Sequence, residues 1–196
     1  IAGRRLANAA LALLGAVEDR EVTSLAEAQF ASADNMTDSQ AALAVLCQHH
    51  GESRENALDA FYHRWKDDAL VLDKWFGLQA TSRPVDASAA TRLRGHVDFT
   101  LDNPNRVRAL AGAFAMQNFR GFQAEDGSGY AFLADIVIAL DPKNPQVASR
   151  LVRTLNSWKR FAAPWSDRMK TELGRIAAQD GLSKDVYEIV SSALDE

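Results

Sequence analysis

The sequence predicts an all-α protein in which antiparallel helix pairs stack into a HEAT-like superhelical array. Apolar residues recur every three or four positions along almost every segment, which is the spacing of one helix face. No segment shows the sustained alternation and hairpin turns that are typical of β-strands. Asn103-Pro104 and Asn144-Pro145 stand 41 residues apart, within the period of HEAT-like repeats.

Three apolar stripes predict helices in the first third of the chain. The members of each stripe share one helix face: Leu6, Ala10, Leu13, Leu14 and Val17; Leu43, Leu46 and Cys47; Leu58, Phe61, Tyr62 and Trp65. Such a stripe is stable in water only when a neighbouring element covers it. We therefore expect each of the three to be buried.

Residues that accept hydrogen bonds from free backbone amides mark the helix starts. We expect a capping box from Thr37 to Gln40, and N-caps at Ser53, Ser88 and Ser183. These positions divide the chain into short helices.

The two Asn-Pro pairs predict further helix starts, because proline has no amide to leave unpaired at the first helical position. Similar apolar positions follow each pair: Val107, Leu110, Ala111 and Phe114 after the first, and Val147, Leu151, Leu155 and Trp158 after the second. The parallel between the two stretches favours stacked repeats.

Two short breaks interrupt the helical pattern. One is the Ser82–Asp86 segment around Pro84, and the other is the glycine-rich segment 126–129, which precedes an expected amphipathic helix over residues 130–140. Because both breaks are brief, we expect residues 1–196 to form a single helical domain.

Composition and charge exclude several classes of partner. The chain has 22 basic and 26 acidic residues, a net charge of −4 and a pI near 5.6, so it lacks the basic surface that nucleic acids require. The sequence contains no run of about twenty apolar residues, which a membrane-spanning helix would need. The single cysteine, Cys47, lies in an apolar helix pattern and favours a reducing compartment, and we expect a cytoplasmic protein.

Motifs for catalysis and metal binding are missing from the sequence. A helical zinc site needs two ligands about one turn apart, as in His-Glu-x-x-His, but His49 and His50 are adjacent at an expected helix end. The segment 126–129 lacks the Gly-Lys-Ser/Thr ending of a P-loop, and no Gly-x-Ser-x-Gly elbow occurs. We expect no catalytic residue, metal ligand or cofactor in this chain.

Five segments match the pattern of a known family in order and spacing. They are Asp34–Asp38, Phe61–Trp65, Leu70–Phe76, Asn103–Arg150 and Leu182–Glu188. Together they cover nearly the whole chain, which resembles the C-terminal domain of bacterial aminopeptidase N, the alanyl aminopeptidase of the gluzincin type.

The resemblance implies a superhelical domain that closes over the catalytic domain of a zinc metalloaminopeptidase and encloses its chamber. Zinc and the catalytic residues would belong to that upstream domain of the same polypeptide, so residues 1–196 alone should be inactive. The chain starts at Ile1 rather than methionine, and we expect it to be part of a longer protein.

The resemblance also implies that Arg108, Gln146 and Arg150 line the chamber and bind peptide substrate. Gln146 and Arg150 are four residues apart and share a helix face, and together with Arg153 they form a polar face that is displaced from the apolar stripe of the same helix. The planar guanidinium of arginine suits peptide carbonyls and a terminal carboxylate. The alternative for each side chain is a solvated helix face without a ligand.

A second hypothesis for the whole chain is a stand-alone helical-repeat module that binds a peptide or protein without catalysing a reaction. The repeat spacing and the missing catalytic motifs support this hypothesis, because helical repeats often present extended binding surfaces.

Overall fold

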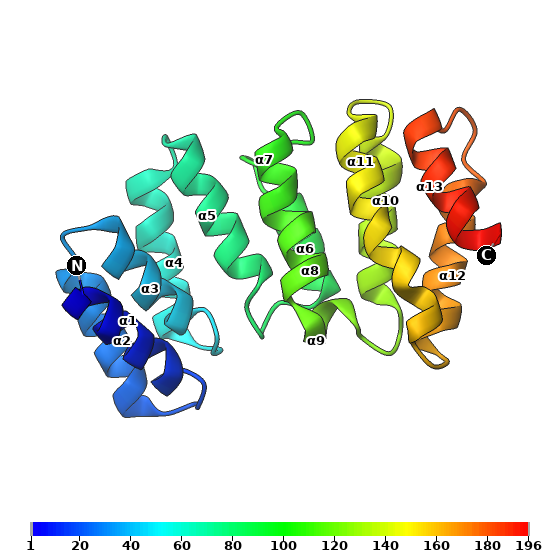
Figure 1. Cartoon of the computed structure of the whole chain (residues 1–196). Coiled ribbons are helices and arrows are strands. Elements are labelled where there is room, and N and C mark those ends of the chain that lie inside the picture. The colour runs from blue at the N-terminus through cyan, green and yellow to red at the C-terminus, as the bar shows by residue number, and fades with distance from the viewer. Residues whose placement is uncertain (1, 196) are drawn as a thin grey trace. The chain divides into compact units, whose positions relative to one another are not determined.

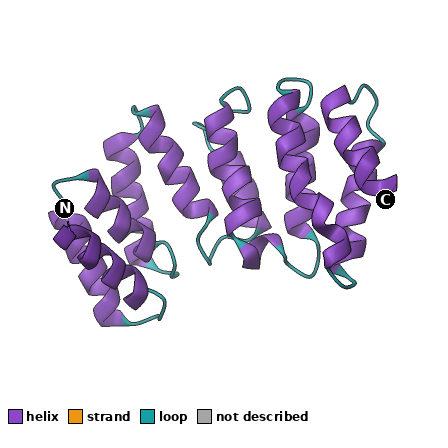
Figure 2. Ribbon diagram, in the orientation of Figure 1, coloured by secondary structure: helices purple, strands orange, loops and turns teal. Residues whose placement is uncertain are grey.

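The computed structural model describes residues 2–195, and all regular secondary structure within that range is helical (Figures 1 and 2). The predicted all-α class is therefore confirmed. The chain divides into two compact units, Ile1–Pro84 and Val85–Glu196. The boundary between the units falls in the predicted break around Pro84. That residues 1–196 form a single domain stays a prediction. None of the described helices is long and apolar enough to cross a bilayer.

Unit 1 is built around α3. Its helices are α1 (Ala2–Leu14), α2 (Arg20–Ser32), α3 (Met36–Leu46), α4 (Glu52–Trp65) and α5 (Ala69–Ala80). α3 packs against α1, α2 and α4, and α4 packs against α5. The predicted stripe of Leu43, Leu46 and Cys47 is buried, as expected for this central helix. The Trp75 indole donates a 3.0 Å hydrogen bond to the Leu58 carbonyl and joins α5 to α4.

Three of the predicted helix starts in the first half of the chain are wrong. Asn35, rather than a Thr37 capping box, caps α3, and its side chain accepts the Asp38 amide at 3.0 Å. α4 begins at Glu52 after Gly51, and α6 (Ala87–Arg94) is capped by Asp86.

Each of these helices starts two residues earlier than predicted. For α3 and α6 an Asn or Asp lies upstream of the expected cap, and these side chains accept amide hydrogen bonds at least as well as Ser or Thr. Gly51 has a φ of 125°, a conformation that glycine adopts without strain, and it lets α4 begin before Ser53.

The predicted burial of the first stripe is also wrong. Leu6 and Leu13 of α1 are 73% and 78% exposed, and Val17, just beyond the helix, is 59% exposed. Leu11, on the other side of α1, is buried instead. The periodicity identified an apolar face correctly, but no described residue covers it.

Unit 2 is a stack of helices in two layers. Its elements are α6, α7 (Pro104–Val107), the π-helical η1 (Arg108–Gly112), α8 (Ala113–Gln117), α9 (Phe119–Phe122), α10 (Ser128–Leu140), α11 (Pro145–Val152), the 3-10 helix η2 (Arg153–Arg160), α12 (Trp165–Ala177) and α13 (Lys184–Asp195). α10 packs against α6 and α12 in one layer, and α11 packs against α13 in the other. This arrangement, visible in Figure 1, agrees with the predicted stacking of helix pairs.

α10 is the core helix of unit 2, and the prediction that it is amphipathic is wrong. Buried residues occupy most of its circumference: Gly129, Tyr130, Phe132, Leu133, Ala134, Ile136, Val137 and Leu140. Phe132 meets Phe114 of α8 edge to face at 5.4 Å, and Tyr130 meets Phe122 of α9 at 5.2 Å. The sequence pattern predicted one buried face, whereas neighbouring helices cover α10 on several sides.

The two Asn-Pro helices start side by side, as the 41-residue recurrence predicted. Asn103 and Asn144 cap α7 and α11 with their side chains, and proline follows each. Asp102 and Lys143, the residues just before the two caps, form an ion pair with 2.7 Å between Oδ1 and Nζ. The hydrogen bond from Lys143 holds the pKa of Asp102 below its ordinary value. Equivalent positions of successive repeats are thus in contact.

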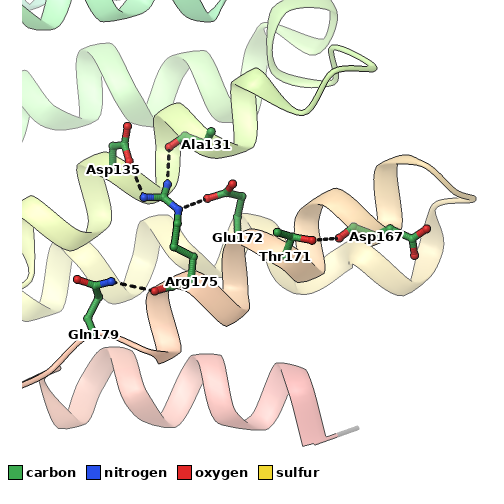
Figure 3. Close-up of polar contacts among 7 residues, drawn as sticks. All are labelled: Ala131, Asp135, Asp167, Thr171, Glu172, Arg175 and Gln179. Carbon is green, nitrogen blue, oxygen red and sulfur yellow. Dashed lines mark hydrogen bonds and ion pairs between the residues drawn. The ribbon is translucent and has the colours of Figure 1, made fainter.

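Arg175 of α12 joins that helix to α10 (Figure 3). Its Nη1 lies 2.7 Å from the Asp135 carboxylate, its Nε lies 2.6 Å from Glu172, and its Nη2 donates to the Ala131 carbonyl at 3.2 Å. The guanidinium of Arg175 therefore donates through three separate nitrogens to partners on two helices, α10 and α12. Such a fork geometry fixes the spacing of adjacent elements better than a single point charge would.

Gly129, in the first turn of α10, and Gly174, inside α12, are helical glycines with different surroundings. A Cβ on Gly129 would lie 2.3 Å from the Phe122 carbonyl oxygen and 2.7 Å from the Phe122 Cα, whereas a Cβ on Gly174 would meet nothing within 4 Å. Backbone atoms cannot rotate away as a side chain can. The close approach of α9 to α10 therefore requires glycine at position 129.

We predict that Gly129→Ala lowers the free energy of unfolding by about 3 kcal/mol, because α9 must move away from α10. Gly174→Ala should raise the same quantity by about 0.5–1 kcal/mol, since alanine restricts the unfolded chain and favours the helix. Urea unfolding followed by circular dichroism measures both. Changes of the same sign in the two variants would contradict the packing described for Gly129.

We predict that Arg175→Met lowers the free energy of unfolding by about 1–2 kcal/mol, because Asp135 and Glu172 lose a shared partner while remaining partly exposed. Lys184→Met, which removes an exposed 3.6 Å pair with Glu188, should cost less than about 0.5 kcal/mol. Thermal unfolding of both variants makes the comparison. A loss for Lys184→Met as large as that for Arg175→Met would show that the α10–α12 link is no stronger than a surface pair.

Candidate functional site

A pocket of about 450 Å³ lies between α11 and α13 in unit 2. α11 and the start of η2 contribute one wall, which consists of Gln146, Ser149, Arg150 and Arg153. α13 contributes the other wall, which consists of Asp185, Glu188 and Ile189. The structure thus places two of the three predicted site residues, Gln146 and Arg150, in one concavity.

The α11 wall is polar because that helix divides its residues between two faces. Val147 and Leu151 are buried in the core, as is Leu155 of the following η2, whereas Gln146 and Arg150 are exposed on the other side. This division matches the predicted displacement of the polar face from the apolar stripe. The core contacts hold the helix in place while the polar side chains stay free for a ligand.

The pocket carries both signs of charge. Arg150 and Arg153 project from one wall, and Asp185 and Glu188 from the other. Among the described residues, no ion pair joins either arginine to either carboxylate; Glu188 pairs instead with Lys184 on its own helix. The arginine donors and the Asp185 oxygens therefore remain available to a bound molecule that carries groups of both kinds.

Arg108, the third predicted site residue, does not line this pocket. It is exposed at the start of η1, where its Nη1 donates a 2.9 Å hydrogen bond to the Asn105 side chain. A Cβ on Gly112, the last residue of η1, would lie 3.8 Å from both the Arg108 Cβ and the Leu151 Cδ2. The base of Arg108 is therefore close to α11, on the helix beside the pocket wall.

The π-helical turn η1 begins at Arg108 and ends at Gly112. Turns of this kind are rare and occur often at functional sites. The neighbouring Arg106 behaves differently, because it is buried and donates to the Asp98 carbonyl. Two arginines two positions apart thus have distinct environments, one within the fold and one on its surface.

Asp141 fixes the start of α13 and hence the acidic wall of the pocket. Its buried carboxylate follows the last turn of α10, where a negative charge is unfavourable, but it accepts the Ser183 amide at 2.8 Å and the Ser183 hydroxyl. The Ser183 oxygen in turn accepts the Val186 amide at 3.3 Å, so the predicted N-cap at Ser183 is confirmed. This contact therefore fixes the start of α13 relative to the end of α10.

Metal-binding and nucleophilic groups are sparse elsewhere in the chain. Within residues 2–195, no group of three or more His, Cys, Asp or Glu side chains is arranged to hold a metal ion. His49 lies in the turn after α3, and its Nε2 is 3.0 Å from the Gly15 carbonyl. Cys47 is fully buried, and burial raises the pKa of its thiol to about 12. These residues serve the packing of unit 1.

The site residues predicted from the sequence did not include the acidic wall of the pocket. Asp185 and Glu188 are three residues apart on α13 and therefore share a face, but that spacing is common on exposed helices. Nothing in the sequence shows that this face turns toward α11. Arg153 was predicted to share the polar face of Gln146 and Arg150, and the structure confirms that it does.

Comparisons with known proteins agree on one family. The family model described as "Domain of unknown function (DUF3458_C) ARM repeats" matches residues 1–195. Aminopeptidase N of Escherichia coli is 42% identical over 195 residues, which are 99% of this chain and 22% of that protein. Aminopeptidase N of Caulobacter vibrioides is also 42% identical, over 98% of this chain and 23% of its own length.

A solved structure gives the same result. Legionella pneumophila aminopeptidase A, crystallised in complex with aspartic acid, superposes with a TM-score of 0.89 and 32% identity over 98% of this chain and 23% of its own. The chain thus spans under a quarter of the length of these relatives, and it corresponds to their C-terminal region.

We predict that Asp141→Ala lowers the free energy of unfolding by about 2 kcal/mol, because the amide and hydroxyl of Ser183 lose a charged acceptor. Hydrogen exchange should accelerate more in α13 than in α10, since the start of α13 loses its support. Asp126→Ala is the matched control, because Asp126 accepts the Ser128 amide at 2.9 Å in an exposed turn and should cost less than about 1 kcal/mol. Equal acceleration in α10 and α13 would contradict the anchoring role of Asp141.

Proposed function

Because the chain belongs to the DUF3458_C family of ARM-repeat domains, we propose that it is the C-terminal helical domain of a zinc aminopeptidase that removes N-terminal residues from peptides. The observation that carries this proposal is the match over nearly the whole chain to the C-terminal region of longer aminopeptidases. In the full-length parent this domain closes the active-site chamber. We place the parent enzyme in the cytoplasm, in keeping with the buried free thiol of Cys47.

Zinc belongs to the upstream catalytic domain of the parent. The described residues of this chain do not fit a zinc site, since no cluster of three suitable ligands occurs among them. When bound upstream, zinc supplies Lewis-acid activation of water and of the scissile carbonyl. The part of this chain in the reaction is to bind and orient the substrate, and residues 1–196 alone are inactive.

The peptide-positioning role falls to Arg108, Gln146 and Arg150. Gln146 and Arg150 share a pocket large enough for one or two residues of a peptide, and Arg108 lies on the adjacent helix. Arginine donates to peptide carbonyls and binds a terminal carboxylate through two parallel hydrogen bonds. Asp185, on the opposite wall, offers acceptors to peptide amides or to a cationic side chain. The pocket therefore suits the distal part of a short peptide.

A stand-alone helical-repeat binding module is the alternative. It would use the same concave polar surface without any catalytic partner. The relatives carry this region as under a quarter of a longer chain, which favours the peptidase. The length of the natural polypeptide, and a His-Glu-x-x-His motif upstream, distinguish the two hypotheses.

We predict that Arg150→Ala in the full-length parent lowers kcat/KM for tetrapeptides by roughly one to two decades, corresponding to about 1.5–3 kcal/mol for a charge-assisted contact. A chromogenic amide of a single amino acid should be affected far less, because it does not reach the pocket. Steady-state kinetics on both substrates gives the ratio.

Arg160→Ala serves as the control for that experiment, because Arg160 is an exposed arginine of η2 that does not line the pocket. It should leave both substrates unchanged. Equal losses on tetrapeptide and chromogenic amide for Arg150→Ala would refute the positioning role.

A further inference from the structure

The α13 wall of the pocket places a carboxylate beside an aliphatic side chain. Asp185, Glu188 and Ile189 all line the pocket, and residues three or four apart share one face of a helix. Asp185 is exposed, whereas Ile189 is partly buried. A lysine or arginine side chain matches this combination, because its apolar stem packs on hydrocarbon while its charged end reaches a carboxylate. The wall therefore has the chemistry of a site for a cationic side chain.

Asp185 carries a charge that no ion pair balances within residues 2–195. The other acid of the wall differs, because Glu188 has the Lys184 ammonium 3.6 Å away. A carboxylate in the first turn of a helix also stabilises the start of that helix through the helix dipole. This second effect does not depend on the substrate. Dependence on the substrate therefore distinguishes a binding role of Asp185 from a purely structural one.

The opposite wall carries the opposite charge, so the charges of the pocket cancel. Arg150 and Arg153 contribute two cations, and Asp185 and Glu188 contribute two anions. A peptide carboxylate bound to Arg150 adds a negative charge to a pocket that already holds two acids, and like charges repel. A ligand that also brings a positive group to the acidic wall offsets this repulsion. A C-terminal lysine or arginine carries both groups on one residue.

We propose that Asp185 is a specificity-determining residue for the distal end of the substrate, and that the pocket selects peptides that end in lysine or arginine. The terminal carboxylate binds Arg150, the aliphatic stem lies on Ile189, and the cationic end pairs with Asp185. This selection concerns the last residue of the peptide rather than the N-terminal residue that is removed. The inference rests on the proposed function, in which the pocket holds the distal part of a short peptide.

Three tetrapeptides that differ only in their last residue test the proposal on the full-length parent. Ala-Ala-Ala-Lys, Ala-Ala-Ala-norleucine and Ala-Ala-Ala-Glu present the same bond for cleavage, and norleucine keeps the stem of lysine without its charge. The kcat/KM for the lysine peptide should be about threefold above that for the norleucine peptide and roughly tenfold above that for the glutamate peptide. Chromatography of the released alanine gives each rate.

Substitutions of Asp185 should change the order of the three peptides. Asp185→Asn should bring the ratio of the lysine to the norleucine peptide to about one, because the charge pair is lost. Asp185→Lys should reverse the order and favour the glutamate peptide. Asp180→Asn and Asp180→Lys are the matched controls, because Asp180 is exposed in the turn before α13, does not line the pocket and gives the same change in net charge. Both controls should keep the wild-type order.

A second variant and the salt dependence keep the test decisive where Asp185→Lys destabilises the start of α13. Glu188→Gln should lower the ratio of the lysine to the norleucine peptide by less than about twofold, since Lys184 already balances part of that charge. Raising the ionic strength should also lower the ratio in the wild-type parent, because exposed charge pairs are screened by salt.

The possible outcomes separate this inference from the proposed function. Equal kcat/KM for the three peptides in the wild-type parent would overturn the inference, and an equal fall for all three in Asp185→Asn would assign Asp185 to the helix start alone. If Arg150→Ala still weakens tetrapeptide cleavage in that case, the proposed function stands. A parent without aminopeptidase activity would refute the proposed function itself.

Discussion

Unit 2 depends on the requirement that α10 be covered on several sides at once. A helix with Tyr130, Phe132 and Leu133 on different parts of its circumference cannot remain at a surface without exposing large apolar side chains. α6 and α12 flank it, α11 packs on it, and α9 approaches so closely that Gly129 must lack a side chain. The neighbouring helices are therefore held in one order by a single shared core.

The candidate pocket is a product of that order. α11 reaches the core through Val147 and Leu151, and this contact leaves its other side free to carry Gln146 and Arg150. Asp141, at the end of α10, then fixes where α13 begins. Among the described residues, the opposite charges that line the pocket do not pair with each other. Such preformed polar groups lose little freedom when a ligand binds.

The sequence predicted the helical class, the Asn-Pro helix starts and the shared face of Gln146 and Arg150, because each follows from spacing within one helix. Predictions that needed knowledge of a neighbour were less successful. The stripe of Leu6 and Leu13 was identified as a face but wrongly assigned to the interior. The acidic wall of Asp185 and Glu188 was missed, because only the stacking of α13 on α11 turns ordinary surface carboxylates toward an arginine.

The π-helical turn between α7 and α8 has a consequence for comparing this helix with others. An i→i+5 turn accommodates about one residue more than an α-turn, so the helical phase after it shifts by roughly 100°. Arg106 and Phe114 can both face the interior even though they lie on opposite sides of that shift. A homologue with one residue deleted here would preserve most of the alignment yet rotate its counterpart of Arg108 toward another direction. Sequence identity around this position is thus a poor guide to side-chain orientation unless the helical register is also matched.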